Sequence, residues 1–176
     1  AFLKEYMDRT LKTRDEISTL LDGLTLLGVL HHDEVLDKDS HLVPRIVMTN
    51  PNSLLGESFK ILRSNLQKVV EAGQKVFAVS SSLPGEGKTT VASNLAISFA
   101  LAGKKVLLVD LDLRKPKLHT IFPSGEEKGT GAVATDIENL WLWKAPEVKD
   151  YSLYLESPGF LSELMKQKEW ADVILL

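Results

Sequence analysis

The stretch that most constrains this chain runs from Val76 to Thr90 and reads VFAVSSSLPGEGKTT. It predicts a short apolar strand, a glycine-bearing loop and the first turn of a helix. In that context, the backbone N–H groups of the loop and the positive end of the helix make a nest for phosphate oxygens. We therefore expect an α/β protein with a nucleotide site at this loop.

The loop carries the residues of a phosphate-binding motif, with one departure. Lys88 is expected to reach the outer phosphates of a nucleotide, and the hydroxyl of Thr89 to bind Mg²⁺. The strict pattern has glycine six positions before the lysine, where this chain has the small residue Ser82. An ordinary strand-to-helix turn would leave the Gly-x-Gly-Lys-Thr run unexplained. The residues expected to bind the nucleotide are Ser82, Pro84, Gly85, Glu86, Gly87, Lys88, Thr89 and Thr90.

The composition is that of an ordinary globular protein and excludes several classes. The 176 residues suffice for one domain, and the hydrophobic content of 44% and charged content of 26% are typical. A net charge of −3 gives no indication of nucleic acid as a partner. The absence of cysteine excludes disulfides and thiol chemistry. No apolar run approaches the roughly 20 residues that span a bilayer.

Residues 1–53 are predicted to be linker helices and a connector that precede the nucleotide-binding domain, residues 54–176. Residues 1–22 predict two helical pieces, and residues 24–30, LTLLGVL, predict a short buried strand. Residues 31–53 are polar and interrupted by two prolines, as in a connector. The pair His31–His32 lacks a third ligand at suitable spacing, so we interpret it as solvated loop histidines.

Residues 54–70 predict an amphipathic helix whose apolar stripe faces the core. Glu57, Lys60 and Arg63 lie three residues apart on its polar side. By themselves such charges indicate a solvated helix face. They could equally pair with opposite charges on a neighbouring subunit.

A continuous apolar strand, residues 105–110, ends in two alternating carboxylates, Asp110 and Asp112. Such a strand belongs to a parallel sheet with helices on both faces, and ligands bind at the carboxyl edge of such sheets. Alternation in an extended chain would place both carboxylates on one side. There they could hold Mg²⁺ through water or accept a proton from a hydroxyl group. The alternative is that they cap the next helix.

The remaining elements complete a mainly parallel α/β sheet. Residues 139–145 predict a strand on which Trp141 and Trp143 share one face, for packing rather than base stacking. Ser157–Pro158 predicts a helix start, and residues 171–176 predict a final buried strand. P-loop ATPases end one such strand with an acidic residue that helps hold Mg²⁺. This sequence stops before that position, so we expect it to be part of a longer protein.

The combination of motifs resembles the bacterial tyrosine kinases, the cytoplasmic ATPase domains of polysaccharide co-polymerase systems. The run Ser-x-x-Pro-Gly-Glu-Gly-Lys-Thr-Thr matches their phosphate loop, and residues 106–114, followed by Lys115–Pro116, match their Walker A′ motif. Residues 57–63 look like their oligomerisation motif, Glu-x-x-Arg-x-x-Arg, with lysine in the middle. Residues 2–28 are similar to the segment that links the second transmembrane helix to the kinase.

The resemblance implies autophosphorylation with MgATP, releasing ADP, on a C-terminal tyrosine cluster and in trans within a ring of identical subunits. It further implies the cytoplasmic domain of an inner- or plasma-membrane protein that works with polysaccharide export and polymerisation machinery. Lys60 would lack the bidentate fork of arginine. The implied roles are phosphate neutralisation for Lys88, Mg²⁺ binding for Thr89, metal binding and tyrosine activation for Asp110 and Asp112, and subunit contacts for Glu57, Lys60 and Arg63.

Three departures from the family are visible. The tyrosines, Tyr6, Tyr151 and Tyr154, form no tail, the Walker B acid is absent, and the interval between residues 129 and 139 is short. One rival interpretation is a partitioning or division-site ATPase, but that group has a lysine where this chain has Leu83. Another is a nucleotide-gated assembly module without kinase activity.

Overall fold

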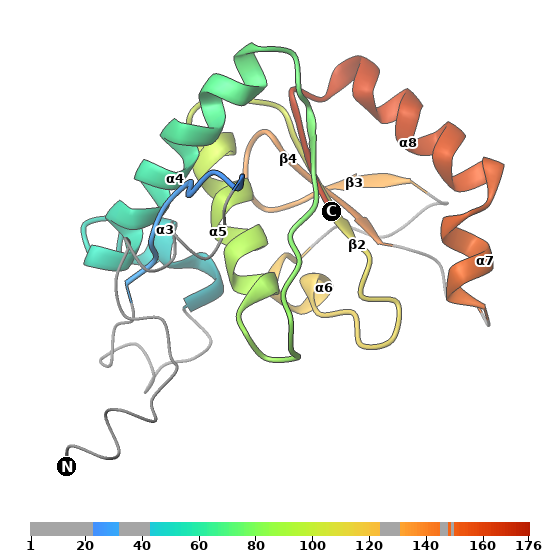
Figure 1. Ribbon diagram of the computed structural model, residues 1–176, viewed down its shortest axis with the longest axis horizontal. Coiled ribbons are helices and arrows are strands. Elements are labelled where there is room, and N and C mark those ends of the chain that lie inside the picture. The colour runs from blue at the N-terminus through green and yellow to red at the C-terminus, as the bar shows by residue number, and fades with distance from the viewer. Residues whose placement is uncertain (1–22, 32–42, 124–130, 145–147, 149) are drawn as a thin grey trace.

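The computed structural model describes residues 23–31, 43–123, 131–144, 148 and 150–176. The predicted helices of residues 1–22, and residues 32–42 of the predicted connector, lie outside these residues. The described part contains a five-stranded sheet in the order β1-β5-β2-β4-β3 (Figure 1). The strands are β1 (Val76–Phe77), β2 (Val106–Asp110), β3 (Ala132–Ala134), β4 (Leu140–Lys144) and β5 (Val173–Leu175).

The sheet is mainly parallel, as predicted. Strands β1, β5, β2 and β4 pair in parallel, and only β3 pairs antiparallel, with β4. In the register of β2 and β4, Asp110 lies opposite Lys144. The two strands therefore end together at the same, carboxyl-terminal edge of the sheet.

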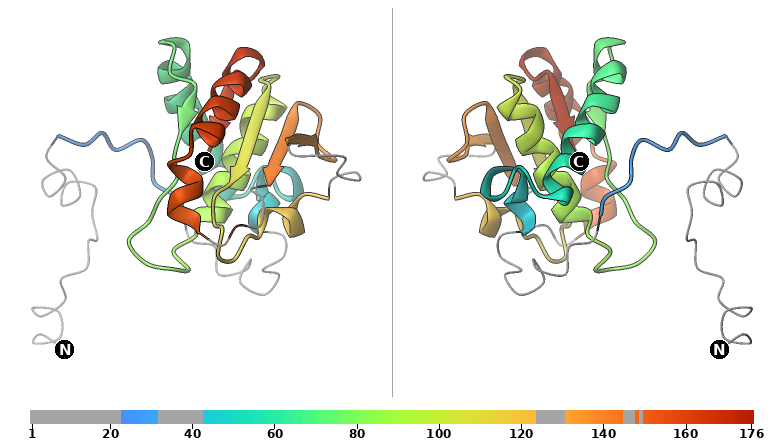
Figure 2. Two further views of the ribbon diagram at one scale, coloured as in Figure 1. Left: turned by 90° about the vertical axis from the view of Figure 1, so that its right-hand side faces the viewer. Right: turned by 90° about the vertical axis from the view of Figure 1, so that its left-hand side faces the viewer.

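Helices cover both faces of the sheet, which confirms the predicted architecture (Figures 1 and 2). Along β2, Val106 and Leu108 join the core beneath α3, α4 and α5, while Leu107 and Val109 join the core beneath α8. The helical elements are η2 (Val43–Arg45), α3 (Ile46–Thr49), α4 (Leu54–Glu71), α5 (Lys88–Leu101), α6 (Leu118–Ile121), α7 (Tyr151–Leu155) and α8 (Pro158–Trp170).

Helices α4 and α8 confirm the helices predicted from sequence. The apolar stripe of α4 is buried at Leu55, Phe59 and Leu66. The hydroxyl of Ser157 accepts a hydrogen bond from the Phe160 N–H at the start of α8, with proline next in the chain. No helix in the described part of the chain is long and apolar enough to cross a membrane.

The prediction of a buried strand at residues 24–30 is wrong. This segment pairs with no strand, and Leu24 is 70% exposed. It lies instead along α4, where Leu27 and Leu30 pack against the core and the Asn65 side-chain amide donates to the Leu27 carbonyl at 2.7 Å. A helix surface, not a sheet edge, takes up its apolar residues.

Residues 43–49, which belong to the predicted connector, contain two short helical elements that the sequence analysis did not predict. They form η2 and α3, and both Ile46 and Val47 are buried in the core shared with α4 and α5. Buried Asn94 of α5 holds them: its carbonyl oxygen accepts from the Val47 N–H at 3.1 Å, and its amide donates to the Val43 carbonyl at 2.7 Å. The hydrogen bonds of the Asn94 side chain, which is remote in sequence, therefore hold residues 43–47 in place.

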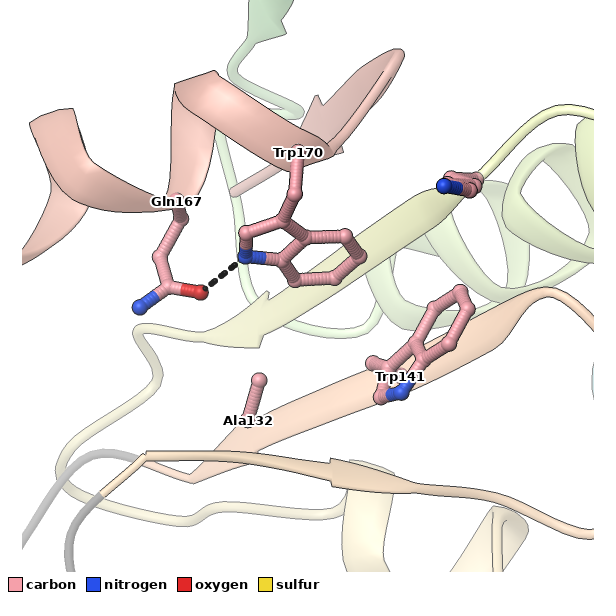
Figure 3. A pocket seen from close by; sticks show the side chains of 5 residues that line it. Ala132, Trp141, Gln167 and Trp170 are labelled. Atoms are coloured by element: carbon pink, nitrogen blue, oxygen red, sulfur yellow. Dashed lines mark hydrogen bonds between the residues drawn. The ribbon is translucent and has the colours of Figure 1, made fainter.

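The tryptophans of β4 pack as predicted, and Figure 3 shows one of them, Trp141, beside Trp170. The Trp141 ring meets Trp170 of α8 edge-on, with 4.9 Å between centroids, and the Trp143 ring lies 5.6 Å from Phe160. Edge-to-face and offset pairs at such distances stabilise a core beyond the area that they bury. These rings join α8 to the sheet.

Candidate nucleotide site

The predicted phosphate loop connects the carboxyl end of β1 to the start of α5. Gly85 and Gly87 have φ angles of 86° and 93°, in the left-handed region that favours glycine. Residues 82–86 are exposed, and residues 87–90 are half-buried where the helix begins. The loop is thus open to solvent, and its turn depends on two residues without a Cβ.

The N-terminus of α5 has the free donors that an anion needs. The first N–H groups of any helix lack partners within the helix. In α4 and α8, serine side chains accept one of them, whereas Gly87 at the N-cap of α5 makes no such bond. With the glycine-bearing loop in front of it, this terminus fits a phosphate group.

Lys88 lies across the loop that precedes it. Its ammonium group donates to the Ser81 hydroxyl at 2.9 Å and to the Leu83 carbonyl at 3.4 Å. The Glu86 carboxylate accepts from the Leu83 N–H at 2.9 Å and closes the turn. Phosphate oxygens are charged acceptors and bind an ammonium group more strongly than a neutral hydroxyl or carbonyl does. Lys88 can therefore exchange Ser81 and Leu83 for a phosphate group.

Asp110 is buried, with a 6% exposed side chain, and caps the loop that follows β2. One carboxylate oxygen accepts from the Asp112 N–H at 3.2 Å. The other accepts from the N–H groups of Lys117 and Leu118, both at 3.0 Å. For Asp110, the structure therefore supports the alternative interpretation, in which the carboxylate caps the start of the next helix. Its two oxygens also fix the loop after β2.

Asp112 differs from Asp110, and the prediction that both lie on one side of an extended strand is wrong. Strand β2 ends at Asp110, so the alternation does not continue. Asp112 is exposed, and one of its oxygens accepts from the Lys115 N–H at 3.1 Å. Its other oxygen takes no part in the hydrogen bonds found among the described residues.

A cavity of about 330 Å³ lies between this loop and the start of α7. Asp112 lines it together with Arg114 and Tyr151, and its other lining residues are Leu111, Leu113, Asp150, Ser152 and Leu155. Sequence reasoning assigned no role to Tyr151. No spacing rule links it to Asp112; the parallel register of β2 and β4 brings the two segments to one edge.

The three residues predicted to contact a neighbouring subunit lie on α4 as expected. Lys60 forms an ion pair with Glu57 of the same helix at 2.7 Å, and Arg63 is half-buried. An exposed pair of this kind contributes about 0–1 kcal/mol. The structure describes a single chain, so subunit contact remains a prediction.

A second hollow, of about 460 Å³, lies between α8 and the sheet (Figure 3). It is lined by Lys105, Ala132, Trp141, Gln167 and Trp170. The Gln167 carbonyl oxygen accepts from the Trp170 indole N–H, and its amide donates to Glu163, both at 2.8 Å. Since the polar groups of Gln167 and Trp170 are bonded within α8, we interpret the hollow as a feature of packing.

Comparison with known proteins agrees with this geometry. Residues 76–141 match the model of a family described as the CobQ/CobB/MinD/ParA nucleotide binding domain. The tyrosine-protein kinase YwqD of Bacillus subtilis (strain 168) is 50% identical over 78 residues, which are 44% of this chain and 33% of YwqD. Over the aligned residues, the chain is therefore similar to a bacterial tyrosine-protein kinase.

Two further matches extend the relationship. The succinoglycan biosynthesis transport protein ExoP of Rhizobium meliloti (strain 1021) is 37% identical over 105 residues, 58% of this chain and 13% of ExoP. The solved BceF tyrosine kinase domain superposes with a TM-score of 0.82 at 24% identity, over 94% of this chain and 75% of that one, and shows the shared fold. This chain spans a third or less of the length of YwqD and ExoP.

Proposed function

We propose that the protein containing this chain transfers the γ-phosphoryl group of ATP to tyrosine hydroxyls of protein, including its own. The observation that carries the proposal is the uncapped N-terminus of α5 behind a glycine loop, with Lys88 lying across it. Half of the residues aligned with a tyrosine-protein kinase are identical to it. Phosphoryl transfer requires positioning and charge neutralisation, which these groups are suited to supply.

The nucleotide would be held by residues 82–90. The loop N–H groups and those at the start of α5 would bind the phosphates, and Lys88 would neutralise the charge on the β- and γ-phosphates. Thr89 would be a ligand of Mg²⁺, with Asp112, and Asp110 through water, as further candidates. When bound there, Mg²⁺ supplies charge stabilisation to the oxygens around the transferred group.

The different surroundings of the two aspartates support a division of the roles that the sequence left undivided. We infer that Asp110 is a positioning residue, because both of its oxygens hold backbone N–H groups. Asp112, exposed and with one oxygen free of bonds in the described part of the chain, is the candidate to accept the tyrosine proton. Asp110 then acts through the loop that carries Asp112.

The assembly and partners are proposals of the same kind. Glu57, Lys60 and Arg63 would meet opposite charges on the next subunit of a ring, so that one subunit phosphorylates another. The name of ExoP, a succinoglycan biosynthesis transport protein, supports a role beside polysaccharide machinery. We further propose that residues 1–53 link a membrane anchor to the kinase domain, residues 54–176, at the cytoplasmic side.

The experiment that tests this function incubates the full cytoplasmic domain with MgATP and probes for phosphotyrosine and for transfer to a Glu/Tyr copolymer. We expect transfer by the native protein and a loss of at least about 100-fold in Lys88→Met, because the phosphate charge is no longer neutralised. Lys105→Met, which removes an exposed lysine at the opposite edge of the sheet, is the matched control and should retain activity.

No phosphotyrosine in the native protein, or a signal that survives Lys88→Met, would contradict the kinase proposal. ATP binding without any transfer would support the assembly module instead. Retained nucleotide binding with lost transfer in Asp112→Asn would support the division of roles between the aspartates.

A further inference from the structure

We propose that Tyr151 is a phosphoryl acceptor of this chain, a modification site within the kinase domain itself. The inference rests on the proposed function, because it requires a phosphate donor at the loop of residues 82–90. The starting observation is the cavity of about 330 Å³, which Tyr151 lines together with Asp112 and Arg114. A tyrosine, an aspartate and an arginine thus line one cavity.

The fold, and not the sequence spacing, makes this cavity. Its residues come from two segments: residues 111–114, which directly follow β2, and residues 150–155, which come after β4 in the chain and include α7. Strands β2 and β4 are parallel neighbours that end together at Asp110 and Lys144. The loop after β2 and helix α7 lie at the same end of the molecule as the phosphate loop (Figures 1 and 2).

Of the two tyrosines in the described part of the chain, Tyr151 alone lines this cavity. The ring of Tyr154 lies 5.3 Å from that of Phe160 and packs against the core beneath α8. Burial also raises the pKa of the Tyr154 hydroxyl, which makes its phenolate harder to form. Tyr154 is therefore a packing residue and supplies a natural control for Tyr151.

The chemistry of the cavity suits the proposed step. The Tyr151 oxygen attacks the γ-phosphorus of ATP, the bond from that phosphorus to the β–γ bridging oxygen breaks, and ADP leaves. The phenolic proton passes to the Asp112 carboxylate and from there to solvent. The products are ADP, a phosphotyrosine and one proton.

Arg114 offers the product a partner. A phosphotyrosine carries a charge of about −1.5 to −2 at neutral pH and binds arginine through strong hydrogen bonds. The volume of the cavity, about 330 Å³, lies within the range of about 300–1,000 Å³ typical of ligand pockets. It can therefore receive the added group beside Arg114.

The test maps phosphopeptides by mass spectrometry in the full cytoplasmic domain after incubation with MgATP, alongside transfer to a Glu/Tyr copolymer. We expect phosphate on Tyr151 in the native protein, its loss from that peptide in Tyr151→Phe, and no change at Tyr151 in the control Tyr154→Phe. Lys88→Met should carry no phosphate when it is incubated alone.

Two outcomes separate this inference from the proposed function. Copolymer phosphorylation with an unmodified Tyr151 peptide overturns the acceptor site and leaves the kinase standing. Absence of both products overturns the kinase, and the acceptor site with it. Mixing Lys88→Met with Tyr151→Phe shows which chain supplies the phosphate. Label on Tyr151 of the Lys88→Met chain supports transfer between chains. Label on Tyr151 of the native protein alone supports transfer within one chain.

Discussion

The two loops that border the proposed site, residues 78–87 after β1 and residues 111–117 after β2, differ in what holds them. In the first, the donors at the start of α5 have no side-chain cap, and the bonds that shape the turn come from the half-buried side chain of Lys88 and the exposed side chain of Glu86. In the second, a buried carboxylate accepts three backbone N–H groups. The first loop has donors to offer a ligand, whereas the second has used its donors to fix its own shape.

This difference explains why neighbouring acidic residues need not share a role. Both oxygens of Asp110 hold the second loop, and that loop in turn carries Asp112 and Arg114 to the rim of a cavity. A loop with its own internal acceptor can present side chains in a fixed position before any ligand arrives. In the phosphate loop, by contrast, no side chain caps the N–H groups at the start of α5.

The largest effect on stability should come from Asp110→Ala. It leaves three N–H groups without an acceptor, the bond from Leu118 being fully buried, and each unsatisfied donor costs about 1–3 kcal/mol. We expect a loss of about 3–5 kcal/mol in the free energy of unfolding, measured by urea denaturation. Asp110→Asn keeps one acceptor oxygen, so its free energy of unfolding should lie between those of the native protein and Asp110→Ala. A change under about 1 kcal/mol would show that the loop does not depend on this carboxylate.

Asp112→Asn should show the reverse pattern. Its single exposed bond contributes little to folding, so the free energy of unfolding should stay within about 0.5 kcal/mol. Loss of the proton acceptor should lower kcat for tyrosine transfer by about 100-fold, with the KM for ATP changed much less. If stability and activity fell together, the proposed contrast between the two aspartates would be wrong.

Gly87→Ala should have a smaller effect on folding than Asp110→Ala. A Cβ at a φ angle of 93° costs about 1–2 kcal/mol, although the space around it is open. Strain here should also weaken nucleotide binding, measured by calorimetry with ATP. Gly73→Ala, at a similar φ of 97° in the turn after α4, is the matched control and should lose stability but keep nucleotide affinity.

The parts of the fold that sequence alone predicted are those with short-range signals. The phosphate loop, α4 and the start of α8 each depend on glycines, caps or an apolar period within a few residues. The same reasoning failed at residues 24–30 and missed the helical elements of residues 43–49. Their burial is decided by distant partners, the surface of α4 in one case and the Asn94 side chain in the other.

The nucleotide loop was therefore determined by sequence, since its residue types, spacing and left-handed glycines are local properties. The different surroundings of Asp110 and Asp112, and the cavity that Asp112 shares with Tyr151, were decided only by tertiary structure. A strand that ends at Asp110 turns one carboxylate inward and leaves the other outside. The parallel register that pairs Asp110 with Lys144 then brings a tyrosine from a remote segment to the same edge, and no local pattern encodes that register.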